Sequence, residues 1–209
     1  MKIAVICANG KAGKKIVAEA LSRNLDVTAI VRGENKSDAK KVIVKDILQI
    51  TKDDLKDFDV VIDAFGAWTA ETLPLHTTTS QHLCDVLSGT ETRLLIIGGA
   101  GSLYLDKEHK TQLFKSPEFP KEYLPTATAQ SNELDELRKR NDVKWTFVSP
   151  AADFQADGER TGKYILGGEE FILNDKGESV ISYADYAVAM IDEATKGNHI
   201  QQRISVVKA

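Results

Sequence analysis

The chain has 209 residues, and its 27 Lys and Arg against 31 Asp and Glu give a net charge of −4. This length predicts one domain over residues 1–209, because two domains would each have only about 100 residues for a core. The acidic balance argues against a non-specific nucleic-acid binder, which needs cationic surface, and leaves open a local basic pocket for a small anion.

The first half of the chain alternates between strand-like and helix-like runs. Residues 2–7 (KIAVIC) form a short apolar run that is typical of a strand buried on both faces of a parallel sheet. After Gly10 and Gly13, apolar residues recur at helical spacing from Lys14 onward. The same reasoning predicts further strands at 26–31, 41–44, 59–64 and 93–97 and a helix at 73–87, with a polar connection at 33–40 too short for a crossover helix.

The second half continues the alternation after an irregular, proline-containing segment at 102–125. Helices are predicted at 127–140 and 183–194, strands at 144–148 and 203–207, and a small hairpin at 164–173 around a Gly-Gly turn. Repeated β-α units with glycines at strand ends indicate a doubly wound, mostly parallel Rossmann-like α/β sheet in three layers. We expect a small C-terminal segment on the substrate side.

The turn after the first strand, CANGKAG at 7–13, is the first candidate binding element. Gly10 would let a pyrophosphate approach the backbone, and Gly13 would let the helix pack tightly with its free N–H groups aimed at the anion. Cys7 stands where the first glycine of such turns usually lies, and an ordinary tight turn is the alternative. The predicted cofactor-binding residues here are Ala8, Asn9, Gly10, Lys11, Ala12 and Gly13.

The residue that ends the second strand usually selects between NAD and NADP, and here it is Arg32. An arginine neutralises a 2′-phosphate, and Lys11 could add a second charge, so we expect NADP(H) to be preferred over NAD(H). Glu34 lies two residues beyond Arg32. The alternative for both cations is an ordinary solvated surface position.

Three further strand ends would meet the same crevice, since ligands of such sheets lie outside the carboxyl ends of the strands. Asp46 could bind the adenine amino group or cap its own turn. Small residues flank one aromatic at 64–66, and the glycine-rich run at 98–101 indicates that something passes close by. The predicted cofactor contacts at these ends are Asp46, Ala64, Phe65, Gly66 and Gly98.

Together these segments resemble the atypical short-chain dehydrogenases/reductases, specifically the small NAD(P)-binding proteins of the NADH-flavin reductase type. The resemblance covers essentially the whole chain and is more distant to biliverdin-IXβ/flavin reductase. It is carried by CANGKAG at 7–13, VTAIVR at 27–32, VIDAFG at 61–66, LIIGGAGSLYLD at 95–106, WTFVSPAADF at 145–154, GERTGKY at 158–164 and SYADYAVAMIDE at 182–193.

The sequence departs from the larger dehydrogenase family in its acid/base residues. That family pairs a tyrosine with a lysine four residues later, which lowers the tyrosine pKa for proton transfer. Here Tyr123 is followed four residues on by Ala127, and no other tyrosine has such a lysine. This argues against alcohol oxidation but not against reduction of a flavin, whose electrophilic ring mainly needs positioning.

The resemblance implies roles for several residues near the nicotinamide. Ser102 would be an active-site serine, although an ST-turn or helix cap explains it equally well. The segment Ser149, Pro150 and Ala151 would pass beside the carboxamide as part of the cofactor site.

Three more residues are candidates for contact with the acceptor. Tyr123, the second candidate catalytic residue, and Phe154 could stack on an isoalloxazine ring, although an aromatic near a strand end is more often core. Arg160 could bind an anionic substrate group or anchor a surface hairpin.

Other function classes have no positive support in the sequence. His76 and His82 are six residues apart, which is not a metal-ligand spacing, and we expect no metal site. Cys7 and Cys84 suit buried thiols rather than a disulfide framework. Because no run approaches about 20 apolar residues, and Asn9 interrupts the apolar N-terminus, we expect a cytoplasmic protein without a targeting segment or membrane partner.

The leading hypothesis is therefore an NAD(P)H-dependent oxidoreductase that passes hydride to a flavin, a quinone or a similar planar small molecule. A flavin would be a substrate rather than a bound prosthetic group. The alternative is a non-catalytic NAD(P)-sensing regulatory protein, which equally explains the missing Tyr-Lys pair. A nucleotide-sugar epimerase or dehydratase ranks third, and the oligomeric state stays open.

Overall fold

An eight-stranded sheet runs through the centre of the molecule in the order β3-β2-β1-β4-β5-β6-β10-β8. The structure is a computed structural model that describes all of residues 1–209. All neighbouring strands of this sheet are parallel except β8, which pairs antiparallel with β10. The strands are β1 (Lys2–Ile6), β2 (Asp26–Val31), β3 (Lys41–Val44), β4 (Val60–Asp63), β5 (Arg93–Ile97), β6 (Lys144–Ser149), β8 (Tyr164–Gly167) and β10 (Gln202–Lys208).

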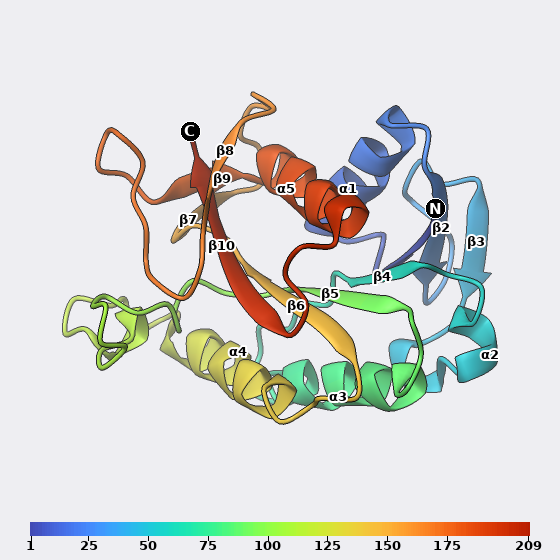
Figure 1. The fold of residues 1–209 in the computed structure, drawn as a ribbon, viewed down its shortest axis with the longest axis horizontal. Coiled ribbons are helices and arrows are strands. Elements are labelled where there is room, and N and C mark those ends of the chain that lie inside the picture. The colour runs from blue at the N-terminus through green and yellow to red at the C-terminus, as the bar shows by residue number, and fades with distance from the viewer.

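Helices cover both faces of the sheet and give a three-layer α/β fold, as predicted (Figure 1). One face carries α1 (Lys11–Ser22) and α5 (Tyr183–Lys196), and the other carries α3 (Leu75–Leu87) and α4 (Leu124–Leu137). The short helix α2 (Lys52–Leu55) and the 3₁₀ turns η1 (Ile47–Gln49) and η2 (Leu113–Lys115) lie in connections. None of these helices combines the length and apolar content needed to cross a bilayer.

Strand β1 illustrates why the sheet is buried on both faces. Ile3 and Val5 belong to the apolar core beneath α1 and α5, whereas Ala4 and Ile6 belong to the core on the α3 and α4 face. Successive side chains of a strand point to opposite faces, so a continuous apolar run suits a strand that has helices on both sides.

Two predicted helices begin earlier than expected. Helix α1 starts at Lys11, directly after Gly10 at its N-cap, rather than at Lys14. Helix α4 starts at Leu124 with a proline in its first turn, rather than at Ala127. Proline suits that place because the first helical N–H groups have no partner within the helix. The first turns, KAGK in α1 and LPTA in α4, contain glycine or proline, which in a sequence indicate the preceding turn or loop rather than the helix.

The predicted hairpin at 164–173 is wrong. Strand β8 pairs instead with the C-terminal strand β10, so that Gly167 faces Ser205. The following residues cross to Tyr104, whose backbone N–H donates to Glu169 O at 2.9 Å and whose O accepts from Phe171 N at 2.8 Å. The Gly-Gly pair thus ends a sheet strand rather than closing a hairpin.

A second, two-stranded sheet was not predicted. It pairs β7 (Asp153–Gln155) with β9 (Val180–Ser182) in parallel. Strands of three residues are too short to produce a readable alternation in the sequence. This small sheet is the C-terminal segment that stands next to the cavity described below.

Candidate functional site

A cavity of about 1500 Å³ lies along the carboxyl ends of the parallel strands. Its wall takes residues that follow β1, β2, β4, β5 and β6, together with the small sheet and the loops around α4. Parallel strands bring their carboxyl ends to one edge of the sheet, and this is where ligands of doubly wound sheets bind. The cavity is therefore the candidate site.

The glycine turn forms one end of this cavity. Asn9, Gly10, Lys11 and Ala12 line it, and the first turn of α1 contains no acidic residue that would repel an anion from the free N–H groups. Cys7 adopts a φ of +57°, the left-handed conformation that glycine adopts most readily. The cysteine thus keeps the shape of the turn that a glycine usually provides.

Gly13 and Ala8 lie behind the turn rather than on the cavity wall. Both are buried, and a Cβ on Gly13 would come within 2.7 Å of the Cys7 carbonyl oxygen and 2.9 Å of Ala8 Cα. Helix α1 can therefore approach β1 this closely only with a glycine at position 13.

Asn9 connects this turn to the loop after β2. Its Nδ2 donates to Glu34 O at 2.8 Å, and its Oδ1 accepts from Lys36 N at 2.6 Å. Arg32, at the start of the same loop, is exposed and lines the cavity together with Lys11. Glu34 is not on the cavity wall, so no carboxylate of this loop competes with Arg32 for a ligand.

Asp46 and the 64–66 segment also line the cavity. The Asp46 carboxylate accepts from Leu48 N at 3.0 Å and so caps the turn η1, the alternative that its position also suggested. Next to it, Lys45 pairs with Asp54 at 2.6 Å. Ala64, Phe65 and Gly66 continue the wall beyond β4.

The glycine-rich run after β5 lines the cavity, but its small residues are needed for the chain's own packing. A Cβ on Gly98 would lie 2.2 Å from Cε1 of Phe147, and one on Gly99 would lie 2.1 Å from Oε1 of Gln130. What passes close to this run is therefore a ring of β6 and an amide of α4.

Ser102 does not reach the cavity, contrary to the role that the resemblance implied. Its side chain is 3% exposed, and its Oγ accepts a hydrogen bond from Nη1 of Arg203 at 2.9 Å. Arg203 also pairs with Glu169, so this group fixes the loop after β8 to β10. Ser149 is likewise buried and absent from the wall, whereas Pro150 and Ala151 line it.

Arg160 is also turned away from the cavity. Its Nε lies 2.9 Å from Oε2 of Glu19, a side chain of α1 that is only 5% exposed and also pairs with Arg23. These two arginines hold the pKa of Glu19 below its ordinary value despite its burial. The contact anchors the 158–164 segment to α1, which is the structural alternative to substrate binding.

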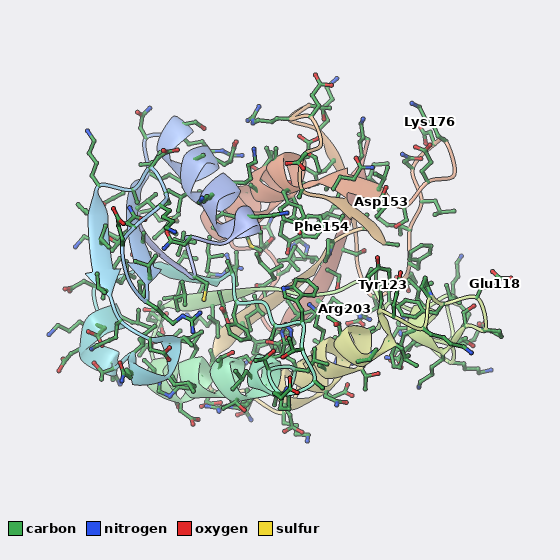
Figure 2. All side chains as sticks on the ribbon, turned by 180° about the vertical axis from the view of Figure 1, so that it is seen from behind. Glu118, Tyr123, Asp153, Phe154, Lys176 and Arg203 are labelled. Atoms are coloured by element: carbon green, nitrogen blue, oxygen red, sulfur yellow. The ribbon has the colours of Figure 1, made fainter.

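Phe154 and Tyr123 both line the other end of the cavity. The Phe154 ring packs against Tyr183 and Tyr186, with centroids 4.0 Å and 4.8 Å away, while Tyr123 is 57% exposed at the start of α4. Figure 2 shows Phe154 and Tyr123 coming from opposite sides of the sheet, at the end of the molecule where the loop before α4 carries Glu118.

Several wall residues escaped the sequence reasoning, among them Trp68, His76, Phe119, Gln130 and Phe171. A signal for Gln130 was present: Tyr123, Thr126, Ala127 and Gln130 all line the cavity at spacings of three and four residues. This spacing places them on one face of α4. No comparable pattern marks Trp68 or Phe171, which lie in loops.

Three buried titratable groups lie close together near β4: His76, which lines the wall, and Glu133 and Asp63, which do not. Nδ1 of His76 lies 3.7 Å from Oε2 of Glu133, both side chains being 3% exposed, and that Oε2 has no hydrogen-bond partner. Burial lowers the pKa of His76 and raises that of Glu133 well above its ordinary value, with a further increase from the nearby Asp63. Burial also raises the pKa of Cys7 in the glycine turn to about 12, so this thiol stays protonated.

Comparisons with known proteins agree with this geometry. A family model described as NAD(P)H-binding matches residues 7–195. The Bacillus subtilis protein YwnB is 46% identical over 99% of this chain and 98% of its own. A Streptococcus pneumoniae structure described as "a putative NADH-flavin reductase" is 57% identical over all of both chains with a TM-score of 0.98.

A further solved structure carries a different description. The Bacteroides thetaiotaomicron protein described as a "putative epimerase" is 36% identical over 99% of this chain and 96% of its own, with a TM-score of 0.86. All of these relatives match the chain over nearly its full length. The chain therefore belongs to the NAD(P)H-binding family, with a Rossmann-like fold.

Proposed function

We propose that this protein is an NAD(P)H-dependent reductase that transfers hydride to a planar small molecule such as a flavin or a quinone. The observation that carries the proposal is a single cavity whose one end is a glycine turn and whose other end is lined by aromatic rings. The 57% identity to the Streptococcus pneumoniae protein supports the same reaction class.

The residues at the glycine turn fit a dinucleotide. Gly10 leaves the cavity side of the turn open, and the N-terminus of α1 offers unpaired N–H groups to a pyrophosphate. Asp46, Phe65 and Gly66, which line the cavity, would border the adenosine, and Pro150 and Ala151 would border the nicotinamide. When bound, the reduced nicotinamide supplies the hydride, and the acceptor takes its accompanying proton from solvent.

The cations at this end favour NADPH over NADH. Lys11, Arg32 and Lys45 all line the cavity near the end of β2, and no carboxylate of the loop after β2 lines it to receive a ribose 2′-hydroxyl. A 2′-phosphate adds negative charge that an arginine can neutralise through two parallel hydrogen bonds. Asn9 would support this arrangement by holding the loop that begins with Arg32.

The other end suits a flat acceptor that needs positioning rather than acid/base help. Tyr123 and Ala127 both line the cavity on α4, so the place where a dehydrogenase would carry its lysine holds a methyl group. The site therefore lacks the tyrosine-lysine pair that a dehydrogenase uses for proton transfer to or from an alkoxide. A flavin or quinone ring accepts hydride directly and can stack between aromatic side chains. The same missing lysine disfavours an epimerase.

The direct test is anaerobic oxidation of NADPH, and separately of NADH, with riboflavin, FMN or menadione as acceptor. The proposal expects acceptor-dependent loss of the reduced-nicotinamide absorbance, faster with NADPH. Tight binding of the cofactor without oxidation by any of these acceptors would instead indicate a non-catalytic NAD(P) sensor. A Gly10→Val variant serves as the control that separates enzymatic from spontaneous oxidation.

A further inference from the structure

The balance of charge on the cavity wall differs between its two ends. The glycine-turn end carries the cations Lys11, Arg32 and Lys45, of which Lys45 pairs with Asp54, and one acidic residue, Asp46. The charged side chains at the aromatic end are both acidic, namely Glu118 and Asp153. The glycine-turn end thus carries an excess of positive charge, whereas the wall of the aromatic end carries only negative charge.

The two carboxylates stand beside the aromatic residues that would hold the acceptor. Glu118 directly precedes Phe119 on the loop before α4, and Asp153 directly precedes Phe154 on β7. Both residues are exposed, and Figure 2 shows Asp153 next to Phe154 and Glu118 at the outer edge of its loop.

Neither carboxylate is neutralised by a neighbouring cation. The Asp153 carboxylate accepts from the uncharged amide Nε2 of Gln155 at 2.7 Å, and Glu118 forms no ion pair. Lys115, Lys121 and Lys176 belong to the same loops but do not line the cavity, and Nζ of Lys115 lies 5.7 Å from the centre of the Phe114 ring. The wall of the cavity also contains the apolar and aromatic side chains Phe119, Tyr123, Phe154, Phe171, Leu173 and Tyr183.

This arrangement gives no partner to an anionic substituent on the acceptor. A phosphate on a flavin side chain carries about two negative charges near neutral pH. At this end it would meet two carboxylates and no wall cation, and like charges in one cleft reduce both affinity and the rate of encounter. An uncharged ring system loses nothing in the same place and buries its faces against the aromatic wall.

We propose, on the basis of the function proposed above, that the acceptor is an uncharged planar ring compound and that Glu118 and Asp153 select against phosphorylated flavins. Riboflavin and FMN form the matched pair of probes, because they share the isoalloxazine ring and differ only in the 5′-phosphate. Menadione is the uncharged quinone probe.

The test compares kcat/KM for riboflavin with that for FMN under saturating NADPH at low and at high salt. We expect riboflavin to be favoured by about 3- to 10-fold at low salt, with a smaller ratio at high salt because ions screen exposed charges. The Glu118→Gln/Asp153→Asn double variant should bring the ratio close to one by raising kcat/KM for FMN.

A matched double variant, Glu91→Gln/Glu136→Gln, removes the same charge elsewhere. Those two side chains pair only with Lys144 and Lys139 and do not line the cavity, so the riboflavin-to-FMN ratio should stay at the wild-type value. Equal or better use of FMN by the wild-type protein overturns the proposal, as does a ratio that the Glu118/Asp153 variant leaves unchanged.

Quenching of flavin fluorescence on binding gives a second readout that does not depend on turnover. Weaker binding of FMN than of riboflavin to the protein with NADP⁺ supports the charge selection, and equal binding contradicts it. Failure of every acceptor to oxidise NADPH would contradict the proposed reductase. The ratio of the Kd values for FMN and riboflavin would still show whether the site selects against the phosphate.

Discussion

The carboxylate of Asp63 accepts a hydrogen bond from the backbone N–H of Phe65 at 2.9 Å although Asp63 is only 2% exposed. This contact turns the chain at the end of β4, where Phe65 enters the cavity wall. No cation pairs with this carboxylate, and burial raises the pKa of Asp63 from 3.8 to about 6. The shape of the cavity wall after β4 thus depends on an acid that is costly to ionise.

This burial predicts a pH-dependent stability that Asp63→Asn removes. Because the folded pKa exceeds the unfolded value, the native state binds more protons between the two values, and the contribution of Asp63 to stability falls as pH rises from about 4 to about 6. The difference between the two pKa values corresponds to about 3 kcal/mol. The asparagine variant, which can still accept from Phe65, should gain up to that amount at neutral pH and match wild type in acid.

Urea unfolding of both proteins across this pH range measures the effect. The exposed Asp53→Asn variant is the control, since its side chain is 88% exposed and its loss should not alter the profile. If the free energy of unfolding of Asp63→Asn and of wild type changes with pH in the same way, the pKa of Asp63 is not raised in the folded protein.

Arg32→Ala should convert cofactor preference rather than abolish binding. Removing the guanidinium should raise the Kd for NADPH about tenfold, the effect of losing roughly one charged hydrogen-bonding partner, and change that for NADH far less. Titration with both cofactors checks this, with Lys36→Ala as the control because Lys36 is exposed in the same loop but absent from the cavity wall. Equal losses for NADPH and NADH would exclude Arg32 as the selector.

Gly10→Val should block both cofactors while leaving the protein folded. The position is exposed, its φ of −65° and ψ of 163° suit any residue, and its added Cβ would meet only the Cys7 carbonyl oxygen at 3.3 Å. The side chain would instead occupy the space of the pyrophosphate. Circular dichroism and a cofactor titration together test this, and undiminished affinity would place the phosphates elsewhere. Gly13→Val, in contrast, should fail to fold.

Arg160→Ala should leave kcat and KM for the acceptor unchanged. Phe154→Ala should raise the KM for the acceptor, because Phe154 lines the cavity. Arg160 contacts Glu19 rather than the cavity, and the loss of this half-exposed ion pair should destabilise the fold by at most about 1 kcal/mol, since Arg23 continues to pair with Glu19. Steady-state kinetics with riboflavin and a thermal melt separate the two effects. A raised acceptor KM in Arg160→Ala would return this residue to the substrate site.

Local sequence was sufficient for most of the fold. Apolar runs such as residues 2–6 report burial on both faces, and the glycines at 10 and 13 mark the strand-to-helix turn, because these features depend on neighbours only a few residues away. The hairpin predicted at 164–173 failed for the opposite reason. The partner of β8 is β10, about 40 residues later, and the residues around β8 do not indicate which distant strand pairs with it.

The candidate site shows the same difference between features set by local sequence and features set by distant contacts. The sequence by itself determined that the turns after β1, β2, β4 and β5 lie at one edge of the sheet, because each strand end carries its own turn residues. Only the tertiary structure showed that the side chains of Ser102 and Arg160 point away from the cavity. Their partners, Arg203 and Glu19, are 101 and 141 residues away in the sequence. The aromatic and acidic end of the cavity likewise forms only when the loop before α4, the small sheet and the segment after β8 pack together. Its residues are far apart in the sequence, so their spacing does not indicate that they share a site.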